Sequence, residues 1–238
     1  MKITEATWEK RNLGVTTYEI GIDYDDDVSC IDSIKRIECE YMVVKVSANN
    51  IAIIDEIQEL GFRYIEDMIQ VEHDLKEIEY NPIWQRLYDA CSYRRMTDGD
   101  IEQLRDEIKA GMFKDDRISR DKHFGVKVSA VRYLNWFNDL LERGALPYVI
   151  RYKEENGGFI VLTTKDGITY SSVLGGGYTK YRKTGLGVVK KEMEITKSLG
   201  GKRLISAVSA NNPGQVRALI INGYKPYNIE HVFVRHSK

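Results

Sequence analysis

Residues 203–212 read RLISAVSANN and residues 41–50 read YMVVKVSANN, so the five residues VSANN occur twice in the chain. The offset between the copies is 208 − 46 = 162 residues, and the same offset carries Gly61 onto Gly223. After one inserted residue, His73 matches His236. Five consecutive identities with a matching glycine indicate an internal repeat. Taken alone, the repeat fits a shared structural unit as well as a functional one.

Each copy predicts a strand, a helix and a returning strand. The apolar runs at residues 42–46 and 204–208 are typical of buried strands. The Ser-Ala-Asn-Asn segment that follows can turn the chain and cap a helix, because Asn side chains accept bonds from backbone N–H groups. Apolar residues then recur at helical spacing until a glycine ends the helix. We therefore expect one β-α-β unit in each half of the chain.

The remaining sequence predicts further strands and helices around these two units. In the first half, a strand is expected at residues 16–22 and a helix at 25–35. Thr97 and Asp100 resemble a box that starts a helix. In the second half, strands are expected at residues 93–96, 148–152, 159–163 and 168–174, helices around 101–108 and 131–141, turns at 155–158 and 165–167, and an irregular polar segment at 112–127. This order predicts a mixed α/β fold.

The segment at residues 175–187 reads GGGYTKYRKTGLG and leads into an amphipathic helix. The first turn of a helix has unpaired N–H groups and a dipole that attract anions, and glycines let a phosphate approach the backbone. Arg182 and Lys183 add positive charge there. The order of the glycines matches neither a Walker P-loop nor a dinucleotide-binding turn. The segment therefore predicts a phosphate site of another type.

These elements resemble the GNAT acetyltransferase superfamily, whose coenzyme A loop reads Gln/Arg-x-x-Gly-x-Gly/Ala. Arg182, Gly185 and Gly187 match that loop, and Asn212 with Gly223 matches the Asn and Gly of a later element, in which Tyr224 replaces the usual Phe. The resemblance implies acetyl-CoA as the acyl donor, with its pyrophosphate held by the loop. The implied coenzyme-binding residues are Val173, Leu174, Arg182, Lys183, Thr184, Gly185, Leu186, Gly187 and Asn212.

The resemblance also implies the domain organisation. A complete GNAT domain would span residues 92–238, a partial GNAT-like unit residues 1–76, and a linker residues 77–91. The start of the chain, TWE at 7–9, and the run IQELGF at 57–62 are similar to dTDP-fucosamine acetyltransferase-like enzymes, which also join a partial unit to a complete one. That similarity implies an amino-deoxysugar nucleotide as acceptor. An amino acid, polyamine or peptide amine, or a coenzyme A-binding module without activity, remain alternatives.

The sequence leaves the catalytic groups open. Many GNAT enzymes place a tyrosine acid seven residues after the motif Asn, but 212 + 7 = 219 is Leu219, which fits a core position. Attack by a neutral amine needs a base, and the strand at 168–174 contains no carboxylate. The candidates for acid or base are Tyr178, Tyr181 and His123, with Tyr224 as a further conceivable donor. Candidates for the acceptor side are Arg117, Asp121, Tyr133 and Trp136, although these also fit a surface arginine, a loop aspartate and core aromatics.

Composition limits the partners. A net charge of −1 with interspersed acidic and basic residues argues against a general nucleic-acid binder. No apolar run reaches the roughly 20 residues that span a bilayer, and the N-terminus does not resemble a secretory signal. The three cysteines and four histidines show no spacing typical of a metal site. We expect a cytoplasmic enzyme that acts on a small-molecule amine without metal, nucleic acid or membrane, with a homodimer left open.

Overall fold

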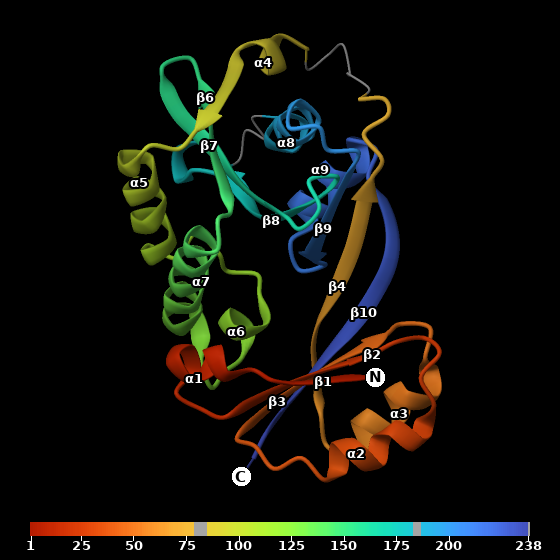
Figure 1. Ribbon diagram of the computed structural model, residues 1–238. Coiled ribbons are helices and arrows are strands. Elements are labelled where there is room, and N and C mark those ends of the chain that lie inside the picture. The colour runs from red at the N-terminus through yellow and green to blue at the C-terminus, as the bar shows by residue number, and fades with distance from the viewer. Residues whose placement is uncertain (79–84, 183–186, 238) are drawn as a thin grey trace.

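The computed structural model describes residues 1–78, 85–182 and 187–237 (Figure 1). These residues form a single mixed sheet in the order β1-β2-β3-β10-β4-β9-β8-β7-β6-β5. The strands are β1 Lys2–Glu5, β2 Thr17–Ile22, β3 Tyr41–Ser47, β4 Arg63–His73, β5 Cys91–Arg95, β6 Leu146–Tyr152, β7 Glu155–Thr164, β8 Thr169–Gly177, β9 Arg203–Ser209 and β10 Lys225–His236. The sheet twists so strongly that β1 to β3 cross below the upright strands β4 and β10 (Figure 1).

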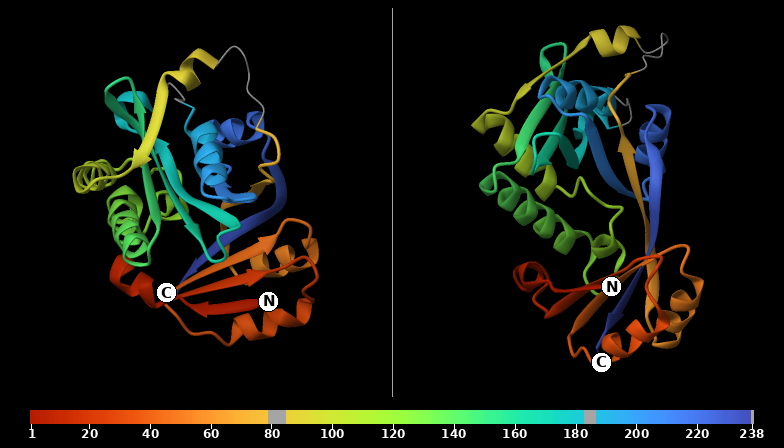
Figure 2. Two further views of the ribbon diagram at one scale, coloured as in Figure 1. Left: turned by 45° about the horizontal axis from the view of Figure 1, so that its top comes forward. Right: turned by 45° about the vertical axis from the view of Figure 1, so that its right-hand side comes forward.

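Helices cover both faces of the sheet (Figure 2). They are α1 Thr7–Leu13, α2 Ile31–Lys35, α3 Ile51–Glu59, α4 Gln85–Asp89, α5 Asp98–Lys109, α6 Arg117–Arg120, α7 Gly125–Glu142, α8 Val188–Ser198 and α9 Pro213–Ile221, with 3₁₀ turns η1 Val28–Cys30 and η2 Thr179–Tyr181. On β10, Phe233 packs with α2 and α3 while Val232 and Val234 face α6 and α7. The face under α2 and α3 continues to α8 and α9, and the opposite face packs on α5, α6 and α7.

The repeat is confirmed as β3-α3-β4 and β9-α9-β10, and the two copies exchange their last strands. β10 pairs with β3, through Val234↔Val43, whereas β4 pairs with β9, through Ile69↔Val208. β4 and β10 also pair with each other at the centre of the sheet. The two halves of the chain therefore share one sheet and two central strands. The division proposed at 77–91, of which residues 79–84 lie outside the described part, stays a prediction.

Most of the expected elements are confirmed, with a few corrections. The helix expected at residues 25–35 is only η1 followed by the short α2. The turn expected at 155–158 is wrong, because β7 already begins at Glu155 and the turn lies at Lys153, which has a φ of 56°. Gly158 is a strand residue packed against α8, where a Cβ would come within 2.8 Å of Val188 Cγ2. β1, α1, α6 and α4, which lies in the segment expected as a linker, had not been predicted.

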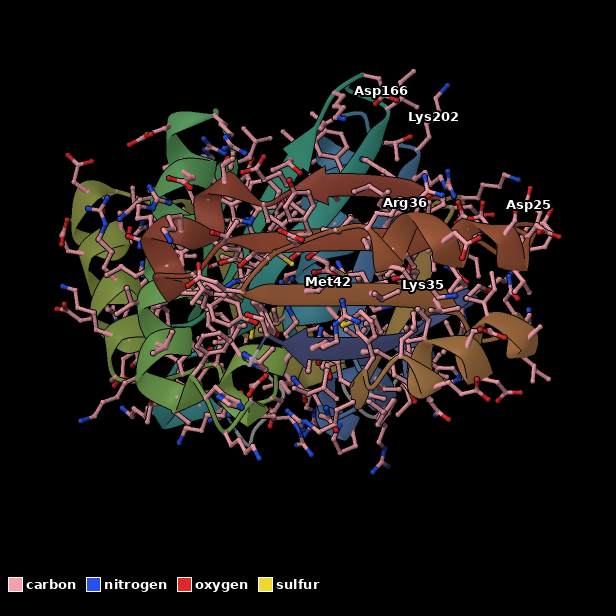
Figure 3. All side chains as sticks on the ribbon, turned by 90° about the horizontal axis from the view of Figure 1, so that it is seen from below. Asp25, Lys35, Arg36, Met42, Asp166 and Lys202 are labelled. Carbon is pink, nitrogen blue, oxygen red and sulfur yellow. The ribbon has the colours of Figure 1, made fainter. Side chains whose placement is uncertain are left out.

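The core beneath α2 and α3 illustrates how apolar alternation forms these layers. Met42, Val44 and Val46 of β3 point to the same face and are at most 1% exposed. In the view from below, Met42 lies on the strands, and the charged residues Asp25, Lys35 and Arg36 lie around α2 (Figure 3). Asp166 and Lys202 lie together at the top of that view. Among the described residues, no helix is long and apolar enough to cross a bilayer.

Candidate active site

The parallel strands β8 and β9 pair only over their first half. Their register runs from Thr169↔Arg203 to Ser172↔Ser206, and no pairing follows although β8 continues to Gly177 and β9 to Ser209. Lys202 N donates to Ile168 O at 2.8 Å, which fixes the paired end. Backbone N–H and C=O groups need partners, so the diverging edges of two strands are available to bind a ligand. We call this divergence beyond Ser172 and Ser206 the β8–β9 opening.

A β-bulge lies at the start of the β8–β9 opening. On the β7 side, Leu162 pairs with Ser172 and Val161 pairs with Leu174, which leaves Val173 without a partner in the register. A bulge bends its strand and turns two successive side chains the same way. Val173 and Leu174 accordingly both pack on the α5 and α7 face, whereas Ser172 points toward α8. The bulge therefore directs β8 away from β9.

The helix start that follows β8 has the backbone expected of an anion site. Gly187 caps α8 with a φ of 64°, a conformation that side chains other than that of glycine rarely allow. A Cβ on Gly187 would also lie 2.6 Å from the ring of Tyr88. Arg182, exposed at the end of η2, adds a cation on the same connection. The predicted residues Lys183, Thr184, Gly185 and Leu186 lie outside the described part of the chain.

A buried carboxyl that the sequence reasoning missed lies beneath the β8–β9 opening. Glu192 of α8 is 2% exposed, and its Oε2 accepts a hydrogen bond from Ser172 Oγ at 2.8 Å. Its Oε1 accepts a short hydrogen bond from Tyr224 Oη. Burial raises the pKa of Glu192 to about 7, although both hydrogen bonds lower it. The signal in the sequence was a charged residue next to Met193 on the apolar face of the predicted helix.

A second buried carboxyl lies on the opposite face of the sheet. Glu66 of β4 is 4% exposed, and its Oε2 has no hydrogen-bond partner among the described residues. Burial raises the pKa of Glu66, while a hydrogen bond from Ser209, the last residue of β9, lowers it. The Glu66 carboxyl therefore stands at the end of β9 that borders the opening. Sequence reasoning missed it because Glu66 belongs to the other half of the chain.

The predicted acceptor residues Arg117, Tyr133 and Trp136 lie on this same face. Arg117 is only 9% exposed, which corrects the interpretation as a surface arginine. Its guanidinium pairs with Glu19 and, at 3.5 Å, with Glu9, while its Nε has no hydrogen-bond partner among the described residues. Tyr133 stacks on Phe113 at 4.2 Å between ring centroids and lies 5.9 Å from Trp136. Burial raises the pKa of Tyr133.

Asp121 and His123 lie far from the β8–β9 opening. Asp121 Oδ2 is 2.9 Å from Nε2 of His236 near the end of β10. At the level of the opening, Met68 of β4 pairs with both Ser209 and Glu230. His236 is six residues further along β10, which corresponds to about 20 Å. His123 is therefore not placed to act at the opening.

The other predicted residues have defined structural roles. Tyr178 is 2% exposed and packs on Phe159 at 5.8 Å, and Tyr181 Oη donates to Glu155 Oε2 at 2.7 Å. Both contacts are with β7, on the side of β8 away from β9. Asn212 caps α9, with its side-chain oxygen accepting from Gln215 N at 3.1 Å. Leu219 is 1% exposed, as expected of a core residue.

Solved structures with the GNAT fold overlay this chain. A GCN5-related N-acetyltransferase from Sphaerobacter thermophilus gives a TM-score of 0.60 and 13% identity over 82% of this chain and 59% of that one. A GCN5-related N-acetyltransferase from Kribbella flavida gives 0.55 and 9% identity over 94% and 82%. A tandem GNAT protein from the clavulanic acid biosynthesis pathway gives 0.51 and 12% identity over 82% and 64%.

These comparisons establish the fold. The chain has a GNAT fold, an α/β architecture built on one mixed sheet. It spans 59% of the length of the Sphaerobacter protein and 64% of the tandem protein, so their activities do not transfer directly. No family model matches the sequence, and no curated protein matches it either.

Proposed function

We propose that the chain transfers an acetyl group from acetyl-CoA to a primary amine, as an N-acetyltransferase. The observation that carries the proposal is the β8–β9 opening, which lies directly before a helix that starts at a left-handed glycine. Acetyl-CoA supplies the activated acyl group. The bulged β8 backbone near Val173 and Leu174 offers N–H groups that can polarise its carbonyl. The first turn of α8 and Arg182 offer donors and positive charge to its pyrophosphate.

The two buried carboxyls suit the proton transfers of this reaction. The α8 and α9 face is filled by core side chains, so we place the amine on the face of α6 and α7, where Glu66 lies. An alkylammonium must lose a proton before it attacks, and a carboxylate whose pKa is raised by burial is a better base than an exposed one. Glu66 Oε2, which has no partner among the described residues, is the proposed proton acceptor.

Glu192 is the proposed proton reservoir on the opposite face. With a pKa of about 7, its carboxyl is partly protonated near neutrality. Ser172 links it by a 2.8 Å hydrogen bond to the point where β8 and β9 separate. A proton held by Glu192 can thus pass through the Ser172 hydroxyl toward a departing thiolate. This assignment needs no tyrosine at position 219, where the chain has a buried leucine.

The proposed acceptor is an amino-deoxysugar nucleotide bound on the α6 and α7 face. Its support is the sequence similarity at residues 7–9 and 57–62, together with the buried Arg117 and the stacked Tyr133 on this face. A guanidinium with an unused N–H donor fits a phosphate, and an aromatic ring fits a base. We also propose that residues 1–76 form a partial unit and residues 92–238 the complete GNAT domain.

The test is an acceptor screen with acetyl-CoA and purified protein. Release of coenzyme A thiol and the mass of the product are measured with amino-sugar nucleotides, amino acids, polyamines and peptides. Acetylation of an amino-sugar nucleotide is expected, and turnover of another amine would change the acceptor but keep the reaction. Binding of acetyl-CoA without turnover on any amine would indicate a coenzyme-binding module. A folded protein that does not bind acetyl-CoA would contradict the proposal as a whole.

A further inference from the structure

Two histidines and an aspartate from distant parts of the sequence converge between α6, α7 and the end of β10. One ligand atom from each of Asp121, His123 and His236 lies within 4.8 Å of the other two. Asp121 and His123 come from the connection between α6 and α7, while His236 is the last residue of β10. The cluster is separate from the β8–β9 opening, and nothing in the proposed acetyl transfer uses it.

The three side chains are held in place by the surrounding structure. The Asp121 side chain is fully buried, and its Oδ1 accepts a hydrogen bond from His123 N at 3.0 Å. Its Oδ2 lies 2.9 Å from His236 Nε2. The rings of His123 and His236 stack at 4.0 Å with an interplanar angle of 24°. The ring of Tyr41 also packs against the His236 ring, at 4.7 Å between centroids.

This set of donors matches the preferences of one class of ion. Zn²⁺ binds imidazole nitrogens and carboxylate oxygens, and two histidines with one carboxylate form a known type of three-ligand zinc site. Bonds of about 2.0–2.1 Å to a tetrahedral ion separate the ligand atoms by about 3.3 Å. The separation of 2.9 Å between Asp121 and His236 is close to that value, and the exposed His123 can adjust by a side-chain rotation.

We propose that Asp121, His123 and His236 bind a divalent transition metal ion, with Zn²⁺ as the best-fitting ion. The ion takes the place of the hydrogen between His236 Nε2 and Asp121 Oδ2, and solvent fills the fourth position beside the exposed His123. Such an ion joins the α6–α7 connection to the last strand of the sheet. The proposal concerns a site outside the opening and does not depend on acetyl transfer.

A neighbouring arginine gives the proposal a specific consequence. Arg63 lies 3.6 Å from Asp121 Oδ2, and its side chain is 51% exposed. It competes with a metal ion for the same carboxylate oxygen but can turn into solvent. Replacing it by a neutral side chain should therefore tighten metal binding. Because the guanidinium of this pair is half exposed, losing the pair corresponds to a gain of about two- to fivefold.

The experiment is calorimetric titration of the metal-free full chain with Zn²⁺, followed by the absorption spectrum with Co²⁺. One ion per chain is expected, with Co²⁺ bands typical of tetrahedral coordination. His123→Ala and His236→Ala should each weaken binding at least about tenfold. Arg63→Met should strengthen it. Because His123 is exposed, its replacement leaves the fold intact, which circular dichroism can verify.

His231→Ala is the matched control. His231 lies on the same strand and contacts Asp67 at 2.6 Å, but it belongs to no three-ligand cluster among the described residues. Its replacement should leave Zn²⁺ affinity unchanged. The proposal is overturned if Zn²⁺ shows no saturable binding, or if affinity survives in the His123→Ala/His236→Ala double variant. Binding that is lost only when Cys30, Cys39 and Cys91 are replaced by serine would overturn it equally.

Discussion

The described residues contain two parallel strand pairs, β2–β3 and β8–β9, which differ where function is expected. β2 and β3 stay paired along all six residues of β2, from Thr17↔Tyr41 to Ile22↔Val46. β8 and β9 pair over only four positions and then separate. Each pair leads into the same repeated β-α-β unit. The opening is therefore a property of β8 and the connection after it and does not follow from the repeat.

The connections between the paired strands explain the difference. β8 carries the bulge at Val173 and leads to α8, an 11-residue helix that begins at Gly187. β2 has no irregularity in its register with β3 and leads to α2, a helix of five residues. A short helix without a glycine start offers few aligned N–H groups to an anion. This difference is the reason for proposing the donor site in the second copy and a structural role for the first.

Even identical residues of the two copies make different contacts. Asn212 caps α9 by accepting from Gln215 N. Asn50 makes no such cap, and its Nδ2 donates to the carbonyls of Asp23 and Asp26. Asn50 thus holds the connection between β2 and α2 close to the end of the strands. The same residue type stabilises a closed end in one copy and a helix start in the other.

Deleting Val173 should have the largest effect, because it should remove the difference between the β8–β9 and β2–β3 pairs. Without the bulged residue, β8 can keep its register with β7 and lie along β9, as β2 lies along β3. Acetyl-CoA affinity should fall about a thousandfold, since several hydrogen bonds to the donor are lost together. Calorimetry measures the affinity, and Val173→Ala, which keeps the chain length, is the control. Unchanged affinity in a folded deletion variant would contradict the assignment.

Replacing Glu192 by Gln should remove a pH dependence of stability. The pKa of Glu192 is raised from 4.5 to about 7, so the folded state holds its proton more tightly than the unfolded state. Its contribution to stability is complete below about pH 4.5 and is lost as the pH rises to about 7, a change of about 3 kcal/mol. Urea unfolding from about pH 5 to about pH 8 should show this fall in the wild type relative to Glu192→Gln. If the free energies of unfolding of the two proteins change with pH in parallel, Glu192 does not titrate with a raised pKa in the folded state.

Replacing Glu66 by Gln should lower kcat about a hundredfold if this carboxylate accepts the proton of the amine. Because the base must be ionised, wild-type activity should decrease as the pH falls through the raised pKa of Glu66, and the variant should lose that dependence. Glu72→Gln on the same strand is the control, since Glu72 forms a partly exposed ion pair with Arg203. An equal loss in both variants would mean that Glu66 has no special role.

Replacing Gly187 by Ala should weaken acetyl-CoA binding about tenfold, through the positive φ and the contact with the Tyr88 ring. Gly200→Ala is a close match, because Gly200 has a φ of 84° beyond the other end of α8, and a Cβ added there would meet no atom of the described residues within 4 Å. Both variants should lose some stability, but only the first should lose affinity. Affinity lost equally in both would attribute the effect to the helix as a whole.

Local patterns predicted much of the fold. Apolar runs identified β2, β3, β6, β7, β8 and β9, and Thr97 with Asp100 forms the expected capping box of α5. The exchange of β4 and β10 could not be predicted, since both strands fit equally well beside either copy. The short α6 was also missed, because its start depends on Asp116, which accepts from Ile118 N and Ser119 N within a polar segment.

Only the part of the candidate site that is formed by residues close in sequence was predictable. Gly187 and the strand before it follow one another in sequence, and a pattern can show them together. Glu66 reaches the end of β9 only through the pairing of Met68 with Ser209, a contact between residues 141 positions apart, since 209 − 68 = 141. The sequence left open whether Arg117 lies at the surface, because its partners Glu9 and Glu19 lie in the first 20 residues. Sites built across two halves need the tertiary structure.

Hydrogen exchange of the full chain, with and without acetyl-CoA, tests the central claim most directly. If the β8–β9 opening is the donor site, acetyl-CoA should slow exchange at residues 173–177 and at the start of α8, and leave β2 and β3 unchanged. Equal protection of both strand pairs, or none at the opening while acetyl-CoA is bound, would contradict the account.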